Sequence, residues 1–87
     1  MKVEAKKKFI RIFEKRFRSD KVLQKKFKER TAMFEANPSN PFLHDHKLTG
    51  EKEGFRAFSI TGDIRVIYVV EKDIAYFLDI GTHNQIY

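Results

Sequence analysis

The chain has 87 residues, a net charge of +6, 41% hydrophobic residues and no cysteine. This length fits one domain spanning residues 1–87, and the composition is too apolar for a disordered chain. The lack of cysteine excludes disulfides and thiolate metal sites, and no apolar run approaches the ~18 residues of a membrane helix. We therefore expect a small cytoplasmic protein with no membrane partner.

Residues 1–5 are short and ambiguous, although an edge strand would fit them. A helix is expected from Lys6 to Phe17, because four apolar residues recur there at the spacing of one helical face. These residues are Phe9, Ile12, Phe13 and Phe17.

A second helix is expected to begin at Ser19 or Asp20, whose short side chains can cap a free backbone N–H, and to run to Ala36. Its apolar stripe consists of Leu23, Phe27 and Phe34. Because the connection between the two helices is short, they should form an antiparallel hairpin.

Lysine and arginine are concentrated in this helix hairpin. Residues 1–36 carry 13 Lys and Arg against 5 Asp and Glu, whereas residues 37–87 carry 5 against 7. Such asymmetry indicates a polyanionic partner; the alternative is a solvated helix face.

The sequence Asn-Pro-Ser-Asn-Pro at residues 37–41 should end the second helix, because proline disfavours helical geometry in the residue before it. We expect a loop over residues 42–53. From residue 55 the apolar period becomes two, which predicts strands over residues 55–60, 64–70 and 74–80. The expected fold is α+β, with the N-terminal helix hairpin packed on one face of a twisted antiparallel β-sheet.

Two turns should separate these strands. In the first, residues 61–63, Gly62 is expected to supply a positive φ. The second covers residues 71–73.

Arg65 interrupts the most apolar strand, residues 64–70, which we expect at the centre of the sheet. An unpaired buried guanidinium is very costly. Arg65 must therefore either form a salt bridge with Asp63 or Asp79, or face an open surface where its planar fork can bind a phosphate.

The register of the first hairpin decides whether Arg56 lies beside Arg65. If Ile60 pairs with Arg65, the two arginines share a face. If Ile60 pairs with Ile64, Arg56 points the other way, because side chains alternate along a strand. Both registers are compatible with the sequence.

The three histidines are His44, His46 and His83. Their irregular spacing is a weak indication of a metal site, and we expect no metal or cofactor. Imidazole titrates at ~6.5, so it can accept or donate a proton near neutral pH. Cleavage of RNA by its own 2′-OH needs a base, a cation for the phosphate and an acid for the leaving oxygen, which His, Arg and His or Tyr would supply.

Four short motifs follow one another in the second half of the chain: DHKL-G at residues 45–50, GFR at 54–56, I-x-x-D-x-x-x-x-Y at 60–68 and IGTH-x-x-I-Y at 80–87. In order and spacing they resemble the RelE/ParE superfamily of bacterial type II toxins, and they are closest to its YafQ-like and RelE-like mRNA interferases. The resemblance covers residues 42–87 well. The N-terminal half matches in pattern only.

This resemblance implies a RelE-like fold and a toxin that enters the ribosomal A site and cuts mRNA there. The 2′-oxygen would attack the adjacent phosphate and leave a 2′,3′-cyclic phosphate and a 5′-hydroxyl. It also implies a cognate antitoxin that blocks the toxin. The pair would repress its own operon, so that operator DNA is contacted through the antitoxin.

The resemblance also implies roles for individual residues. The catalytic set is His46, Asp63, Arg65, His83 and Tyr87. His46 and His83 match proposed acids or bases, Tyr87 matches an aromatic residue that stacks on a base or assists proton transfer, and Arg56 and Arg65 match positions that bind the scissile phosphate. Which histidine is the base stays open.

The chain departs from both branches at three positions. YafQ-like proteins have a further histidine where this chain has Ser59, and an aromatic residue where it has Ile64. RelE-like proteins have a lysine where this chain has Phe58. The chain thus combines the histidine pair of one branch with Arg65 of the other.

The resemblance accounts for the positive charge of the two helices, because ribosomal RNA, the expected partner, is a dense polyanion. We expect contacts with rRNA from Lys7, Lys8, Arg11, Lys15, Arg18 and Lys25. Two alternatives remain open: a ParE-like toxin that inhibits DNA gyrase without cutting RNA, and a basic nucleic-acid-binding module without activity.

Overall fold

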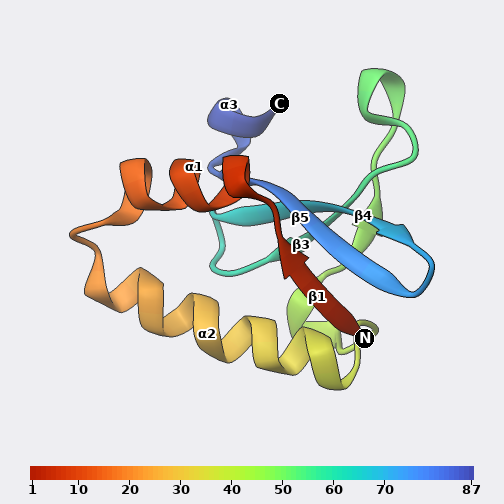
Figure 1. Ribbon diagram of the computed structural model, residues 1–87, viewed down its shortest axis with the longest axis horizontal. Coiled ribbons are helices and arrows are strands. Elements are labelled where there is room, and N and C mark those ends of the chain that lie inside the picture. The colour runs from red at the N-terminus through yellow and green to blue at the C-terminus, as the bar shows by residue number, and fades with distance from the viewer.

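The computed structural model describes residues 1–87, in which two helices cover one face of a five-stranded sheet (Figure 1). The helices are α1 (Lys7–Phe17) and α2 (Lys21–Ala36), within one residue of the expected bounds. Asp20 is the N-cap of α2, since its Oδ1 accepts a hydrogen bond of 2.9 Å from the backbone N–H of Leu23. The predicted helix hairpin is confirmed.

The sheet has the strand order β1-β5-β4-β3-β2. Its members are β1 (Lys2–Ala5), β2 (His46–Lys47), β3 (Arg56–Ser59), β4 (Arg65–Glu71) and β5 (Ile74–Gly81). The expected α+β fold and the central place of β4 are confirmed. The segment that was ambiguous in sequence, β1, is an edge strand and pairs with β5 in parallel, so the sheet is mixed.

The main core lies between the helices and the sheet. It contains 12 buried residues, and Phe9, Phe17, Leu23 and Phe34 from the predicted helix stripes are among them. The Phe34 ring stacks on Phe58 with centroids 4.6 Å apart. Phe58 is fully buried, which explains why an apolar ring stands there and not a lysine that could reach a substrate.

A smaller cluster of four buried residues lies on the opposite face of the sheet: Leu48, Ala57, Ile67 and Ile86. Ile86 belongs to the short helix α3 (His83–Ile86), and Leu48 precedes the 3₁₀ turn η2 (Gly50–Lys52). Figure 1 shows α3 and the segment around residue 50 rising on the same side of the sheet. The C-terminal segment is therefore packed, not frayed.

The segment expected as a loop, residues 42–53, contains more structure than the sequence predicts. It holds most of the 3₁₀ turn η1 (Pro41–Leu43), the two-residue strand β2 and η2. Leu43 is fully buried. His44 follows in the left-handed region with φ 48°, which turns the chain into β2.

The prediction that Gly62 supplies a positive φ is wrong, because its φ lies outside the left-handed region. The Thr61 hydroxyl closes this turn instead, since Oγ1 accepts hydrogen bonds from the N–H groups of Asp63 and Ile64 at 3.2 and 3.0 Å. Positive φ occurs in the β4–β5 hairpin, at Lys72 and Asp73. None of the helices combines the length and apolar character needed to span a membrane.

Candidate active site

The register of the β3–β4 hairpin places Arg56 and Arg65 on opposite faces of the sheet. Ser59 pairs with Arg65, and Arg56 pairs with Tyr68. Arg65 therefore shares a face with Ile67 of the small cluster, whereas Arg56 lies on the face covered by the helices. Of the two registers compatible with the sequence, the structure has the one that separates the arginines.

Arg56 is engaged within the protein. Its Nη2 forms a salt bridge of 3.1 Å with Asp45 Oδ2, and its Nε donates to the Tyr68 hydroxyl at 3.3 Å. The hydrogen bond with Asp45 raises the pKa of Arg56 above its ordinary value against the opposing effect of burial. The structure thus does not bring Arg56 to the phosphate site that the resemblance implied, and gives it a structural contact instead.

Arg65 has no such partner. The two salt bridges of the protein join Arg16 to Asp79 and Arg56 to Asp45, so neither of the salt bridges expected for Arg65 forms. Arg65 is half-buried and lines a cleft. A cation held in a cleft without a carboxylate partner is suited to binding an anion.

This cleft, of about 350 Å³, unites four of the five residues of the expected catalytic set. They are His46, Arg65, His83 and Tyr87. Lys47, Leu48 and Thr49 complete its wall. The residues come from β2, β4 and α3, which lie far apart in the sequence, so their convergence is a product of the fold.

His46 begins β2, opposite Ala57. Its Nδ1 lies 3.0 Å from the carbonyl oxygen of His44. Because a carbonyl oxygen can only accept, Nδ1 must carry a proton. Nε2 of a neutral His46 is then free to accept a proton, which is what a general base requires.

His83 is the first residue of α3, and its ring lies 4.7 Å from that of Tyr87 between centroids. A capping box holds this helix: Gln85 N donates to Thr82 Oγ1 at 3.3 Å, and Thr82 N donates to Gln85 Oε1 at 2.8 Å. Ile86, only 4% exposed, fixes the helix to the sheet. Both proton-transfer groups of the C-terminal segment are thus held at the cleft.

Asp63 does not join them. It is exposed in the β3–β4 turn and does not line the cleft. Nor does it line a second groove that adjoins the cleft. Of the five residues in the expected catalytic set, it is the one that the structure leaves apart.

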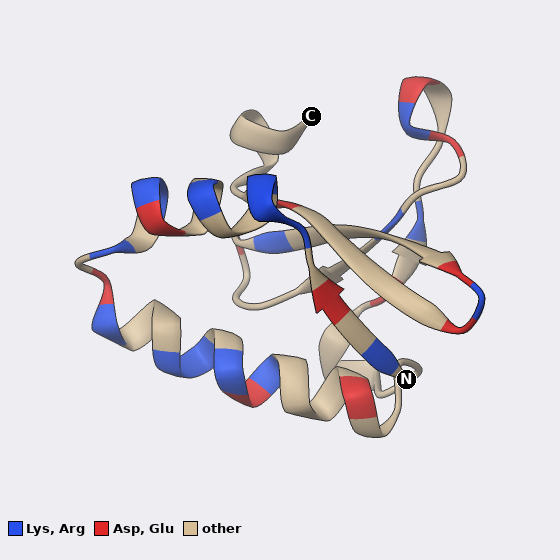
Figure 2. Ribbon diagram, in the orientation of Figure 1, with Lys and Arg blue, Asp and Glu red and all other residues tan.

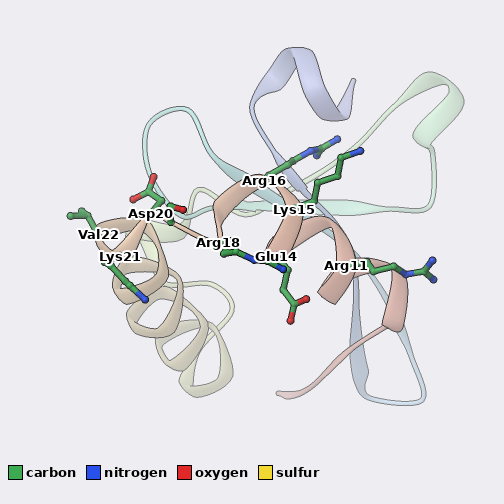
Figure 3. Close-up of a pocket in the computed structure, with 9 residues that line it drawn as sticks. Arg11, Glu14, Lys15, Arg16, Arg18, Asp20, Lys21 and Val22 are labelled. Atoms are coloured by element: carbon green, nitrogen blue, oxygen red, sulfur yellow. The ribbon is translucent and has the colours of Figure 1, made fainter.

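The cationic residues expected to contact rRNA are all exposed on α1, α2 and the turn between them. Figure 2 shows Lys and Arg gathered along these two helices. Arg11, Lys15 and Arg18 line an open concavity of about 1110 Å³ at the α1–α2 turn (Figure 3). Lys7, Lys8 and Lys25 lie outside it.

Arg16, also on α1, has a role that the sequence did not indicate. Because β1 ends at Ala5, opposite Phe77, the edge of β5 beyond that point is free. Arg16 Nη1 donates to the Ile80 carbonyl at 2.7 Å and to Asp79 Oδ1 at 3.3 Å. Figure 3 shows Lys15 and Arg16 projecting to one side of α1. Arg16 thus holds the end of β5, directly before α3.

Asp45 is the second residue that sequence reasoning passed over. Its position between His44 and His46, in a motif of the resemblance, was the available signal. No group of three or more His, Cys, Asp and Glu side chains is placed to hold a metal ion.

Comparison with known proteins tests the fold and the family of the chain. A sequence profile described as "Bacterial toxin of type II toxin-antitoxin system, YafQ" matches residues 1–87. No curated protein matches the chain in sequence. This profile and the solved structures are therefore the comparisons that test the fold and the resemblance to the RelE/ParE superfamily.

Three solved structures illustrate the similarity. A mutant of YafQ from E. coli superimposes with a TM-score of 0.81 at 21% identity, covering 98% of this chain and 96% of that one. A copper-bound mutant toxin from Helicobacter pylori gives 0.73 at 28% identity, with 100% and 99% covered. The E. coli DinJ–YafQ toxin–antitoxin complex gives 0.74 at 20% identity, with 98% and 94% covered. The resemblance seen in the motifs is confirmed, and the chain belongs to the YafQ family of toxins of bacterial type II toxin–antitoxin systems.

Proposed function

We propose that this toxin is an mRNA interferase, an endoribonuclease that cuts mRNA on the ribosome without a metal ion. The observation that carries the proposal is the cleft in which His46, Arg65, His83 and Tyr87 meet. It combines two imidazoles with a guanidinium that no carboxylate neutralises. These are the groups that attack by a 2′-hydroxyl requires.

In the proposed reaction, His46 Nε2 takes the proton of the 2′-hydroxyl, and the 2′-oxygen attacks the adjacent phosphorus. Arg65 stabilises the charge that develops on the phosphate oxygens. The bond between phosphorus and the 5′-oxygen breaks, and His83 gives this oxygen a proton. The products are a 2′,3′-cyclic phosphate and a 5′-hydroxyl.

Tyr87 stacks on a base of the bound RNA in this proposal. Tyr87 is 44% exposed and its ring lies against that of His83, so a stacked base would be held beside the proton donor. Stacking on an aromatic ring contributes about 1–3 kcal/mol per base.

The ribosome is the proposed site of action, in the cytoplasm. The exposed cations of α1 and α2 would dock on rRNA and so bring the cleft to the mRNA. The chain is also proposed to bind a cognate antitoxin, as the toxin of the DinJ–YafQ complex does, and to contact operator DNA through it.

The test is incubation of the toxin with ribosomes translating a defined mRNA, followed by mapping of the mRNA ends. The wild type should yield cyclic phosphate and 5′-hydroxyl ends, and His83→Ala and Arg65→Ala should each lower the cleavage rate by about 100-fold or more. Glu71→Gln, at an exposed position, is the matched control.

Intact mRNA in every reaction would contradict the proposal. Inhibition of DNA gyrase with intact mRNA would favour the ParE-like alternative. Full cleavage by His83→Ala would show that His83 is not the acid.

A further inference from the structure

A second groove adjoins the cleft. It has a volume of about 580 Å³ and is lined by residues of α2, η1 and the β3–β4 turn. His46 and Arg65 line both the groove and the cleft. An RNA strand whose phosphate is bound at Arg65 in the cleft can therefore continue directly into the groove.

The lining of the groove suits a polyanion. Lys26 and Arg30 of α2 and His44 of the loop face the same space as Arg65, and no carboxylate contributes to the wall. Ser59, the single polar residue among the buried ones, adds a hydroxyl next to Arg65. The groove thus links the cationic face of α2 to the proposed catalytic residues.

Phe42 gives the groove an exposed aromatic wall. Phe42 is 67% exposed, whereas its neighbour Leu43 is fully buried and anchors the segment. Since Leu43 supplies the packing, the ring of Phe42 is not needed for the core. An apolar ring that is exposed beside several cations is the arrangement found where nucleic-acid bases stack.

The backbone around Phe42 is held in place. Its N–H donates to Asn40 Oδ1 at 3.0 Å, and its carbonyl accepts from Arg30 Nη1 at 3.2 Å. The Arg30 guanidinium also lies over the ring, 5.7 Å from the centroid. Arg30 thus fixes the segment and presents a positive charge to the same ring.

We propose that this groove is a subsite for the nucleotide that adjoins the scissile phosphate in single-stranded RNA. The base stacks on Phe42, and Lys26 and Arg30 bind the backbone phosphate. The volume lies within the ~300–1,000 Å³ of small-ligand sites. The proposal rests on the proposed function, since it takes the RNA in the cleft to be a substrate.

The experiment measures binding of a short single-stranded RNA with 2′-O-methyl groups at every position, which cannot be cleaved by 2′-attack. Phe42→Ala should weaken binding about 5- to 150-fold, and Phe42→Tyr should keep it within about twofold. Val22→Ala, at an 81% exposed position of α2, is the control and should bind as the wild type does.

A second oligonucleotide identifies the contact. It carries one abasic position beside the central phosphate, with versions for the 5′ and the 3′ side. On one side the wild type should lose as much affinity as Phe42→Ala loses on the intact oligonucleotide. The Phe42→Ala variant should lose nothing further there, because the stacking partner is already gone.

Equal affinity of Phe42→Ala and the wild type, or no binding of the oligonucleotide by the wild type, would overturn the subsite. So would a variant that binds the oligonucleotide normally but binds empty ribosomes more weakly, because the groove would then contact rRNA. A different result would contradict the proposed function alone: the wild type would bind RNA through Phe42 but leave mRNA on translating ribosomes uncut.

Discussion

The hydroxyl of Tyr68 donates a hydrogen bond of 2.6 Å to Asp45 Oδ1, and so joins the central strand to the loop that contains His46. Asp45 Oδ2 accepts a second bond, from Arg56 Nη2 at 3.1 Å. Asp45 itself does not line the cleft. The position of His46 in the cleft therefore depends on a carboxylate outside it.

Asp45→Asn should destabilise the fold and slow RNA cleavage. The amide removes the charge that neutralises Arg56, and the side chain of Asp45 is only 11% exposed. We expect a loss of about 1–3 kcal/mol in the free energy of unfolding, measured in urea. Asp63→Asn, in an exposed turn, should stay within about 0.5 kcal/mol of the wild type. Equal losses in the two variants would mean that the hydrogen bonds of Asp45 with Tyr68 and Arg56 do not stabilise the fold.

Tyr68→Phe should change how stability depends on pH. Burial, and then the hydrogen bond to Asp45, raise the pKa of Tyr68 above its ordinary value of 10.0. The folded state thus holds this proton more tightly, so the stabilisation is complete below pH ~10 and is lost as pH rises further.

At neutral pH, Tyr68→Phe should lower the free energy of unfolding by about 1–3 kcal/mol, because Asp45 loses a donor. Urea unfolding of both proteins from pH 7 to pH 11 is the measurement. The difference in unfolding free energy between the wild type and Tyr68→Phe should narrow above pH ~10. A constant difference would mean that the phenol has the same pKa in the folded and the unfolded protein.

The sequence predicts the elements of this fold well, because its signals are local. Apolar residues at helical spacing locate α1 and α2, and alternation locates the three long strands. The motifs also lead to His46, Arg65, His83 and Tyr87, which the fold brings together. What alternation cannot supply is the register of two strands that are apolar on both faces, so the separation of Arg56 from Arg65 needed the structure.

The two positioning residues escaped prediction for a similar reason. Arg16 is one of 13 Lys and Arg in residues 1–36, and nothing local distinguishes it from Lys15 or Arg18. Its role exists because β1 stops short and leaves an edge of β5 open. Asp45 acts across the sheet, on a tyrosine 23 residues away in sequence.

Arg16→Gln should lower cleavage more than it lowers stability. The substitution removes the ion pair with Asp79 and weakens the hold on the Ile80 carbonyl, which precedes the segment that carries His83. Since the side chains of this pair are 27% and 29% exposed, we expect about 1 kcal/mol or less in the free energy of unfolding.

Arg18→Gln is the matched control for Arg16→Gln, because it removes the same charge from the same end of α1 without touching β5. The measurement is kcat and KM for mRNA cleavage on ribosomes. Arg16→Gln should lower kcat, whereas Arg18→Gln should raise KM alone. Indistinguishable kinetics would mean that Arg16 acts only through its charge.

Gly81→Ala should displace α3 and slow cleavage. A Cβ at this position would lie 2.7 Å from Arg16 Nη1 and Gln85 Oε1, and 2.9 Å from Gln85 Cβ. The first two atoms end flexible side chains, but the Gln85 Cβ is fixed to α3, so the helix must shift. We expect cleavage to fall by about 10-fold or more, because misplacement of a catalytic group by 1 Å is costly. Glu71→Gln, at an exposed position of β4, should cleave as the wild type does.

The association of the toxin with ribosomes should fall steeply as salt rises, because each lysine or arginine that contacts a phosphate releases a counterion. Replacing Arg11, Lys15 and Arg18 by glutamine should reduce the slope of log K against log salt by roughly 2 to 3 units. The three side chains line the concavity at the α1–α2 turn. Binding of a His83→Ala background to ribosomes over a range of KCl concentrations gives the slope without cleavage. The control is a double variant, Lys52→Gln with Lys72→Gln, on the loops of the sheet, and its salt slope should equal that of the wild type. A slope near zero for the wild type would show that these helices do not bind a polyanion.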